Sequence, residues 1–289
     1  MAQTNSAEAR AGWSLIAPPA VYAMLLLAAP LATVLIYSVL TGNNGAVGLP
    51  VTADNYVEIL TKPQYRAVME RSLTVSILVT LTTVLLAYPI AYFVSFHVAP
   101  SKKSLWLFLI TIPFWTSYII RVSLWRTILG YDGIIDSSLI SMGLMDTQLN
   151  ILSSGVTSII ITLSHAYAPF AVLPIFVSLE KVDRALLEAG QDLGETRWTT
   201  FLRVTLPLTM PGVIAAVLIV FIPTVGDYVT PELIGGGKVP MVANFIESQM
   251  LKQRDQAMGS ALAVTAMLIV GIVSLAFVLL NKRFLGARK

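Results

Sequence analysis

Long apolar runs alternate with short polar segments along the whole chain. A helix needs about 20 predominantly apolar residues to cross the hydrocarbon core of a bilayer. Six stretches meet or approach that length, so the pattern predicts six membrane-spanning helices. The first run is longer than the apolar core of about 7–15 residues in a cleaved signal peptide, which favours an uncleaved span. The predicted spans are 16–40, 72–96, 105–124, 156–179, 204–222 and 257–280.

The fifth run is the shortest, and Pro207, Pro211 and Pro223 lie in it or at its end. We expect these prolines to break the helix, because proline lacks the backbone N–H and clashes with the preceding turn. Breaks of this kind are tolerated in membranes where neighbouring helices or a lined cavity satisfy the freed carbonyls. Since four other runs also contain proline, the pattern favours a helix bundle that lines a path through the membrane and changes conformation.

The distribution of basic residues predicts the orientation of the spans. With both termini inside, the cytoplasmic segments hold 11 of the 19 lysines and arginines, and the opposite segments hold 7. Basic residues are enriched on the cytoplasmic side of membrane proteins. The sequence therefore predicts cytoplasmic termini and a long cytoplasmic loop, about 180–207, that leads into the fifth span. No separate soluble domain is visible, so 1–289 is predicted to be one transmembrane domain.

Composition agrees with an all-α integral membrane protein. The chain is 56% hydrophobic and 12% charged, whereas soluble domains are about 25% charged. The absence of cysteine excludes disulfides and thiolate-bound metals. The two histidines, His97 and His165, fall at different membrane depths, which argues against a metal site or a membrane enzyme. The net charge of +3 does not indicate nucleic acid, because the basic residues are scattered between apolar segments.

The long cytoplasmic loop is predicted to form two short helices joined at a glycine. Asp183 is a candidate N-cap for an amphipathic helix. Gly194 permits a tight turn, because glycine accepts positive φ without a steric penalty. A second amphipathic segment follows. Two interpretations stay open from these properties alone: a connector that lies on the lipid headgroups, or a docking surface for a cytoplasmic partner.

The spacing of residues in this loop resembles a known motif. It reads Glu188-Ala189-Gly190, three residues, Gly194, nine residues, then Val204-x-Leu206-Pro207. This is similar to the EAA loop in the membrane subunits of binding-protein-dependent ABC importers. The usual form is Glu-Ala-Ala, three residues, Gly, nine residues, Ile-x-Leu-Pro. The chain departs from it only in having Gly190 for the second alanine and Val204 for isoleucine.

The resemblance implies the six-helix bundle of a type I importer, in the bacterial inner membrane. It implies a coupling helix around 188–194 that sits in a cleft of a separate ATPase, present in two copies. It also implies a second homologous permease, in a heterodimer, and a periplasmic or lipid-anchored substrate-binding protein. No cofactor is implied. The coupling residues would be Glu188, Ala189, Gly190, Gly194, Leu206 and Pro207.

ATP hydrolysis is not expected in this chain. A phosphate-binding loop needs glycine, four residues, then Gly-Lys-Ser/Thr. The nearest candidate is Gly237-Lys238, which Val239 follows in a predicted external loop. The partner subunit would therefore hydrolyse the ATP.

Two further segments are similar to permeases of the spermidine/putrescine subfamily, residues 113–121 and 221–236. The resemblance implies a polyamine or another small organic cation as the substrate. The same machinery carrying an opine, an amino-acid-like cation or an aminophosphonate is an alternative. An ion-coupled secondary transporter would favour inverted repeats and ionisable groups in the membrane, and the predicted spans hold almost no acids.

Several carboxylates and aromatic rings fit recognition of an ammonium group. Aromatic faces attract cations by about 0.5–2 kcal/mol each. An aromatic belt at the membrane surface with ordinary loop acids is the alternative interpretation. The candidate path residues are Asp227, Tyr228 and Glu232 beyond the fifth span, with Trp115 and Tyr118 in the third.

Two ionisable residues lie within predicted spans. Arg121 lies near the outer end of its span, where we expect it to reach the interface or to pair with an acid. A fixed cation repels a polyamine, so a structural or gating ion pair fits Arg121 better than substrate contact. For His165 we expect a neutral ring that is hydrogen-bonded to a neighbouring helix, with a substrate or gating role as the alternative.

Overall fold

The computed structural model describes residues 2–43, 45–131, 133–147, 149, 151, 155–235 and 238–286. Gly236 and Gly237, which belong to the sequence segments discussed above, lie outside the described residues. The chain divides into two compact units, one of Met1–Lys62 and Ile246–Thr265, the other of Pro63–Phe245 and Ala266–Lys289. That the whole chain is a single transmembrane domain stays a prediction.

The first unit contains a long apolar helix and a small hairpin. Helix α1 (Ala2–Ser38) leads into an antiparallel pair of strands, β1 (Leu40–Asn43) and β2 (Ala46–Val51), and then into α2 (Asp54–Thr61). Hydrogen bonds tie α2 to the end of α1, since the Tyr56 hydroxyl donates to Ser38 Oγ at 2.7 Å. The unit also contains η4 (Ser248–Lys252) and the first part of α13 (Gln256–Leu280).

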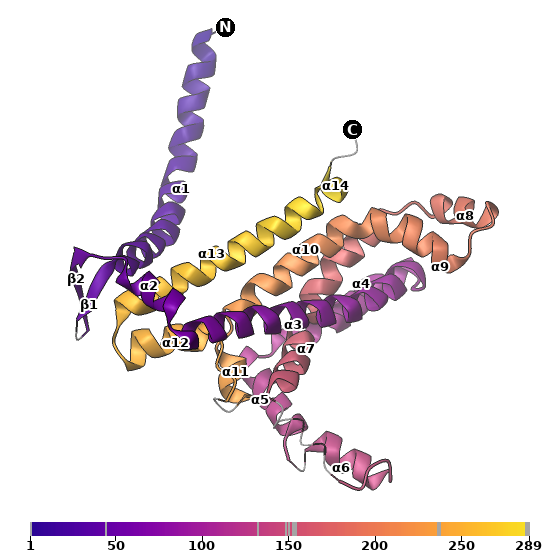
Figure 1. Cartoon of the computed structure of the whole chain (residues 1–289). Helices are drawn as coiled ribbons and strands as arrows, with labels where there is room; N and C mark the ends of the chain where they lie inside the picture. Colours follow the sequence, from indigo (N-terminus) through magenta and orange to yellow (C-terminus); the bar gives the residue numbers. More distant parts are fainter. Residues whose placement is uncertain are drawn as a thin grey trace. The chain divides into compact units, whose positions relative to one another are not determined.

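The second unit is built on three packed helices, α3 (Pro63–Phe96), α7 (Val156–Leu179) and α10 (Leu206–Val225) (Figure 1). Their buried faces form one apolar core in which Val79, Leu163 and Val220 are fully enclosed. At Gly212 a side chain would run into Ser178 and the backbone of α7, so glycine allows a close approach between α10 and α7. Small residues at such interfaces let membrane helices pack closely.

Shorter elements surround this core. They are α4 (Pro100–Thr111), η1 (Ile112–Trp115), α5 (Tyr118–Leu129), α6 (Ile134–Ser141), α8 (Arg184–Asp192), α9 (Arg197–Thr200), η3 (Phe201–Thr205), α11 (Val229–Leu233), α12 (Val242–Glu247) and α14 (Lys282–Leu285).

Within the described residues, five helices are long and apolar enough to span a membrane, or six if one bent pair counts as a span. Segment 105–124 differs from the prediction, because it is not one continuous helix. The pair bends by 88° between Trp115 and Tyr118. Pro113 stands in the short 3₁₀ turn η1 just before the break, and the backbone at Thr116 is extended. The break falls at Thr116 and Ser117, and two polar residues are too short an interruption to divide the apolar run in the hydrophobic pattern.

The expected break of the fifth span at its prolines is wrong. Helix α10 runs from Leu206 to Val225 through Pro211 and Pro223. Pro207 directly follows the π-helical turn η3, in which the Leu206 N–H donates to Phe201 O, so the helix already departs from the regular α pattern where the proline lacks an N–H. The helical segment also begins earlier than predicted, since 197–225 forms one candidate span.

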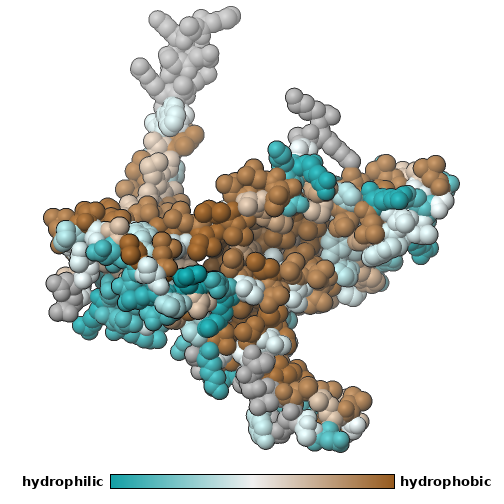
Figure 2. All heavy atoms as spheres, in the orientation of Figure 1, coloured by the Kyte–Doolittle hydropathy of each residue, from teal (hydrophilic) through white to brown (hydrophobic). Residues whose placement is uncertain are grey.

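Apolar side chains dominate the long helices on the face shown in Figure 2. Leu85 and Leu86 of α3 and Leu268 and Ile272 of α13 are more than half exposed. A contiguous apolar surface of this kind is unusual for a soluble protein. It fits contact with lipid or with other membrane subunits.

Candidate functional site

The predicted coupling loop folds as two short helices around a glycine turn. Helix α8 starts at Asp183, whose carboxylate accepts a hydrogen bond from the backbone N–H of Ala185 at 3.0 Å, so the predicted N-cap is confirmed. Glu188 and Ala189 are exposed on α8, and Gly190 is half-buried.

The turn after α8 requires glycine for its backbone conformation. Gly194 has a φ of +85°, a region that costs other residues about 1–2 kcal/mol. Its N–H donates to Gln191 O at 2.9 Å, and the N–H of Glu195 donates to Gly190 O at 3.1 Å. These two bonds form a Schellman cap. A side chain at Gly194 would meet no atom of the chain within 4 Å, so this face of the turn is open.

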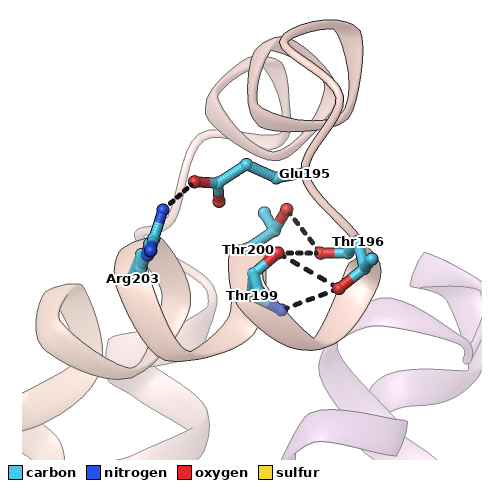
Figure 3. A network of polar contacts seen from close by, with 5 residues as sticks. All are labelled: Glu195, Thr196, Thr199, Thr200 and Arg203. Carbon is cyan, nitrogen blue, oxygen red and sulfur yellow. Dashed lines mark hydrogen bonds and ion pairs between the residues drawn. The ribbon is translucent and has the colours of Figure 1, made fainter.

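The second limb of the loop is held by a local polar network (Figure 3). The Thr196 side chain caps α9 by accepting from the N–H of Thr199 at 3.2 Å, and its carbonyl accepts from the hydroxyls of Thr199 and Thr200. Arg203 forms an ion pair with Glu195 at 2.7 Å. These bonds join the turn to η3 and fix the angle between the two limbs.

The presence of glycine rather than alanine at position 190 is explained by its contact with the second limb of the loop. A Cβ at this position would lie 3.2 Å from Thr200 Cγ2 and 3.3 Å from its hydroxyl. These contacts are tighter than normal van der Waals packing. The chain therefore departs from the usual alanine where α8 lies directly against a β-branched residue.

Polar contacts also anchor the base of the loop to α3 and α4, and sequence reasoning missed them. Lys103 forms an ion pair with Glu180 at 2.7 Å, and the Ser95 hydroxyl also donates to Glu180. Burial alone would raise the pKa of the Glu180 carboxyl, but the bonds from Lys103 and Ser95 and the charge of Lys103 outweigh it and lower the pKa. The only signal in the sequence is opposite charge at the ends of two predicted spans.

Large apolar side chains of the loop remain exposed. Leu193 is 85% exposed and Trp198 is 66% exposed. Trp198 stacks on Phe201 at 5.4 Å between ring centroids. An apolar groove of about 420 Å³ runs beside them, lined by Tyr88, Pro89, Tyr92, Arg197, Trp198 and Phe201. A rigid element with exposed apolar side chains is suited to dock onto another protein.

At the other end of α10, the structure brings two of the five predicted path residues together. The Tyr118 hydroxyl donates to Asp227 Oδ2 at 2.9 Å and lies 2.7 Å from Thr230 Oγ1. Oδ1 of Asp227 accepts from the N–H groups of Val229 and Thr230, at the start of α11. Asp227 is only 7% exposed, and its burial raises the pKa of its carboxyl against the effect of these hydrogen bonds.

The other three predicted path residues are exposed and stand apart from this carboxylate's hydrogen bonds. Trp115 is 76% exposed and packs edge-on against Phe108. Tyr228 is half exposed, and its carbonyl accepts from Asn244 Nδ2 at 2.8 Å. Glu232 is exposed on α11.

The two ionisable residues within the spans have contrasting environments. His165 accepts a hydrogen bond at Nδ1 from Trp125 Nε1 of α5 at 3.1 Å, so the expected bond to a neighbouring helix is confirmed. Arg121 is 7% exposed, and among the described residues no acid pairs with it. Its guanidinium lies instead over the rings of Phe114 and Tyr118, at 5.2 and 5.8 Å from their centroids.

A family of known proteins matches this arrangement of spans and loop. The model of binding-protein-dependent transport system inner membrane components matches residues 65–284. The chain belongs to this family. It is therefore a multi-pass inner-membrane permease subunit, and its transport system includes a substrate-binding protein.

Several curated members of the family are similar over most of their length. The spermidine/putrescine transport system permease protein PotB of Haemophilus influenzae is 37% identical over 81% of this chain and 80% of the relative. PotB of Escherichia coli is 36% identical over 82% and 86%. The inner membrane ABC transporter permease protein YdcU of Escherichia coli is 27% identical over 80% and 75%.

Solved structures of ABC importers share the fold. A chain of a bacterial ABC transporter involved in the import of the acidic polysaccharide alginate superposes with a TM-score of 0.74, over 97% of this chain and 98% of that chain. The two are 17% identical, so the likeness concerns the fold alone. The prediction of an ABC importer permease fold is confirmed.

Proposed function

We propose that this permease carries a small organic cation, a polyamine such as spermidine or putrescine, into the cell. The observation that carries the proposal is the 37% identity, over 81% of the chain, to a spermidine/putrescine permease. A buried carboxylate beside aromatic rings supports it, because ammonium groups are bound by carboxylates and by aromatic faces.

The loop from α8 to η3 is the coupling element in this proposal. The exposed side chains of Leu193 and Trp198 supply apolar contact area to an ATPase subunit, and Glu188 pairs with a basic group there or caps its backbone. Ala189, Gly190 and Gly194 keep the helix thin enough to enter a cleft. Two ATPase copies hydrolyse the ATP and, by closing, draw two such loops together.

The loop transmits this movement through the start of α10. Leu206 and Pro207 are half-buried where η3 becomes α10, so a displacement of the loop shifts the whole helix. Helix α10 ends at Val225, two residues before Asp227. One continuous helix therefore runs between the coupling element and the carboxylate.

The substrate path begins at exposed residues and leads to a buried carboxylate. Trp115, Tyr228 and Glu232 offer aromatic faces and a charge at the surface. Asp227 and the Tyr118 phenol lie deeper, where a carboxylate interacts with a cation more strongly than in water.

A second, homologous permease completes the membrane part, with both termini cytoplasmic. Within its unit, α1 exposes apolar side chains from Trp13 to Ile36. A membrane helix that exposes so many apolar side chains in its own unit is available to pack on a partner. In the heterodimer that we propose, the partner contributes part of the path, and a periplasmic or lipid-anchored binding protein delivers the polyamine.

The decisive experiment is ATP hydrolysis by the reconstituted complex, with its binding protein added empty or loaded with spermidine or putrescine. Stimulation by the loaded protein alone is the expected result. Stimulation by an opine or an aminophosphonate but not by a polyamine would support the importer function and reject the polyamine as its substrate. Failure of the chain to assemble with any ATPase would reject the coupling role of the loop.

A further inference from the structure

The buried guanidinium of Arg121 has too few partners for a charge in its position. Its Nε and Nη1 atoms are enclosed by the protein, and neither has a hydrogen-bond acceptor among the described residues. Two aromatic faces compensate part of the charge. Burial of a cation without an acceptor is nevertheless costly, so we looked for an acceptor that a conformational change would bring to it.

An acceptor within this chain can reach these atoms if the chain rearranges. Nε and Nη1 expose almost no surface, so a neighbouring subunit cannot reach them unless the chain itself rearranges. Tyr118 joins Arg121 to a candidate acceptor, since its ring faces the guanidinium and its hydroxyl donates to Asp227. Arg121 and Asp227 thus share Tyr118 as a neighbour without forming an ion pair.

The backbone beside Arg121 offers a place where such a change can occur. Arg121 is in the first turn of α5, directly after the 88° bend. Its contact with Phe114 reaches back across the bend to η1, while Tyr118 is tied to Asp227 and Thr230 on the other side. Movement at the bend would change which of these groups faces the guanidinium.

We propose that Arg121 pairs with Asp227 in a second state of the transport cycle and so displaces the substrate ammonium from that carboxylate. In the present state Tyr118 contacts both groups, and the carboxylate accepts hydrogen bonds from Tyr118, Val229 and Thr230 instead of from Arg121. In the second state the chain neutralises its own carboxylate, which then no longer attracts a cation. Arg121 is thereby a specificity-determining residue that releases a cationic substrate. This inference rests on the proposed function of Asp227.

Transport kinetics test the displacement. Arg121→Gln removes the charge, so spermidine should be retained longer: maximal uptake is expected to fall about tenfold, and KM is expected to fall with it. A merely structural Arg121 would lower maximal uptake without lowering KM, which would overturn the proposal. The matched control is Arg126→Gln, because Arg126 is exposed on the same helix; it should leave both parameters unchanged.

Cross-linking tests the pairing without any substrate. Because the chain has no cysteine, Arg121→Cys with Asp227→Cys can be probed by a short bifunctional thiol reagent in the nucleotide-free and vanadate-trapped complexes. A several-fold higher yield in one state is expected. The control pair is Ser72→Cys with Val242→Cys, since Ser72 Oγ accepts the Val242 N–H in the core; its yield should not depend on state.

A second buried carboxylate makes the test specific. Asp136 of α6 is 4% exposed, and its Oδ2 has no hydrogen-bond partner among the described residues. Among the described residues Asp136 forms no ion pair with Arg121, and Tyr118 joins Arg121 to Asp227 instead, so Arg121→Cys with Asp136→Cys should not respond to the nucleotide. A response of this pair instead, or equal low yields for the Asp227 pair in both states, would overturn the proposal. The cross-linking yield of the Asp227 pair could depend on the nucleotide in a complex whose ATP hydrolysis does not respond to polyamines. That result would support the pairing and reject the polyamine as substrate.

Discussion

The coupling loop and the Tyr118–Asp227 cluster lie at opposite ends of α10 and are held together in different ways. Bonds within the loop join residues close in sequence, such as Thr196 with Thr199, and its ion-paired Arg203 is 72% exposed. The cluster joins residues 109 positions apart, and its carboxylate is buried. Exposed ion pairs contribute little stability, so the loop's shape depends on backbone conformation, whereas the cluster depends on burial.

This difference predicts that the loop loses its coupling role when its backbone conformation is changed. The Tyr118–Asp227 cluster is predicted to lose its substrate-binding role when a charge is removed. The loop keeps its large apolar side chains free for a partner, so its residues can be altered without loss of folding. The cluster has no such freedom, because each polar atom in it was removed from water and needs a partner.

The largest effect is expected for Gly194→Asp. An aspartate at φ +85° strains the turn and places a charge on an open face that we assign to the ATPase. Uptake by proteoliposomes should be abolished while the permease remains folded in the membrane. Gly271→Ala is the control, because a side chain at Gly271 also meets nothing within 4 Å but has no unusual φ. Undiminished uptake by Gly194→Asp would show that the turn does not couple.

The next largest effect is expected for Asp227→Asn. Loss of the negative charge should weaken polyamine uptake by about 100–1000-fold, since removing one partner of a buried charge pair costs about 3–5 kcal/mol. Co-purification with the ATPase should be unaffected. Glu232→Gln, at an exposed position in α11, should reduce uptake much less. Equal loss of uptake and assembly in Asp227→Asn would make this carboxylate structural.

A smaller effect is expected for Glu180→Gln at the base of the loop. The pKa of Glu180 is lowered in the folded protein, so its ion pair with Lys103 stabilises the fold fully above the ordinary glutamate value of 4.5. This stability is lost as the pH falls through the lowered pKa. The melting temperature of the variant should be slightly below that of the wild type at pH 7. The difference should vanish in acid, and a difference that is constant with pH would exclude the ion pair as its cause.

The smallest effect is expected for Gly190→Ala, which tests whether backbone preference or side-chain contact determines the residue at this position of the loop. Alanine favours helix by about 1 kcal/mol over glycine, but its Cβ would crowd Thr200 at 3.2 Å. The two effects should nearly cancel in thermal unfolding. In a Thr200→Ser background, which removes the crowding methyl group, the same substitution should stabilise the loop. An equal effect in both backgrounds would mean that Thr200 does not limit position 190.

Local features of the site were predictable because each depends on a few consecutive residues. The cap at Asp183 and the turn at Gly194 follow from side-chain and backbone preferences that act within one helical turn. The anchoring of Glu180 by Lys103 was not predictable, because it joins the ends of separate spans. Arg121 was expected to reach the interface or an acid, and its actual position over two rings depends on a bend that apolar composition conceals.

The sequence by itself determined the membrane character of this protein, the approximate spans and the residue spacing of the loop between α7 and α10. Those properties follow from the length of apolar runs, from spacing and from the conformational preferences of single residues. Only the tertiary structure decided that α10 continues through its prolines, that the third span bends, and that Tyr118 meets Asp227 while Trp115, Tyr228 and Glu232 remain exposed. The physical reason is that these features depend on packing and burial between distant segments, which local preference and hydrophobic pattern do not encode.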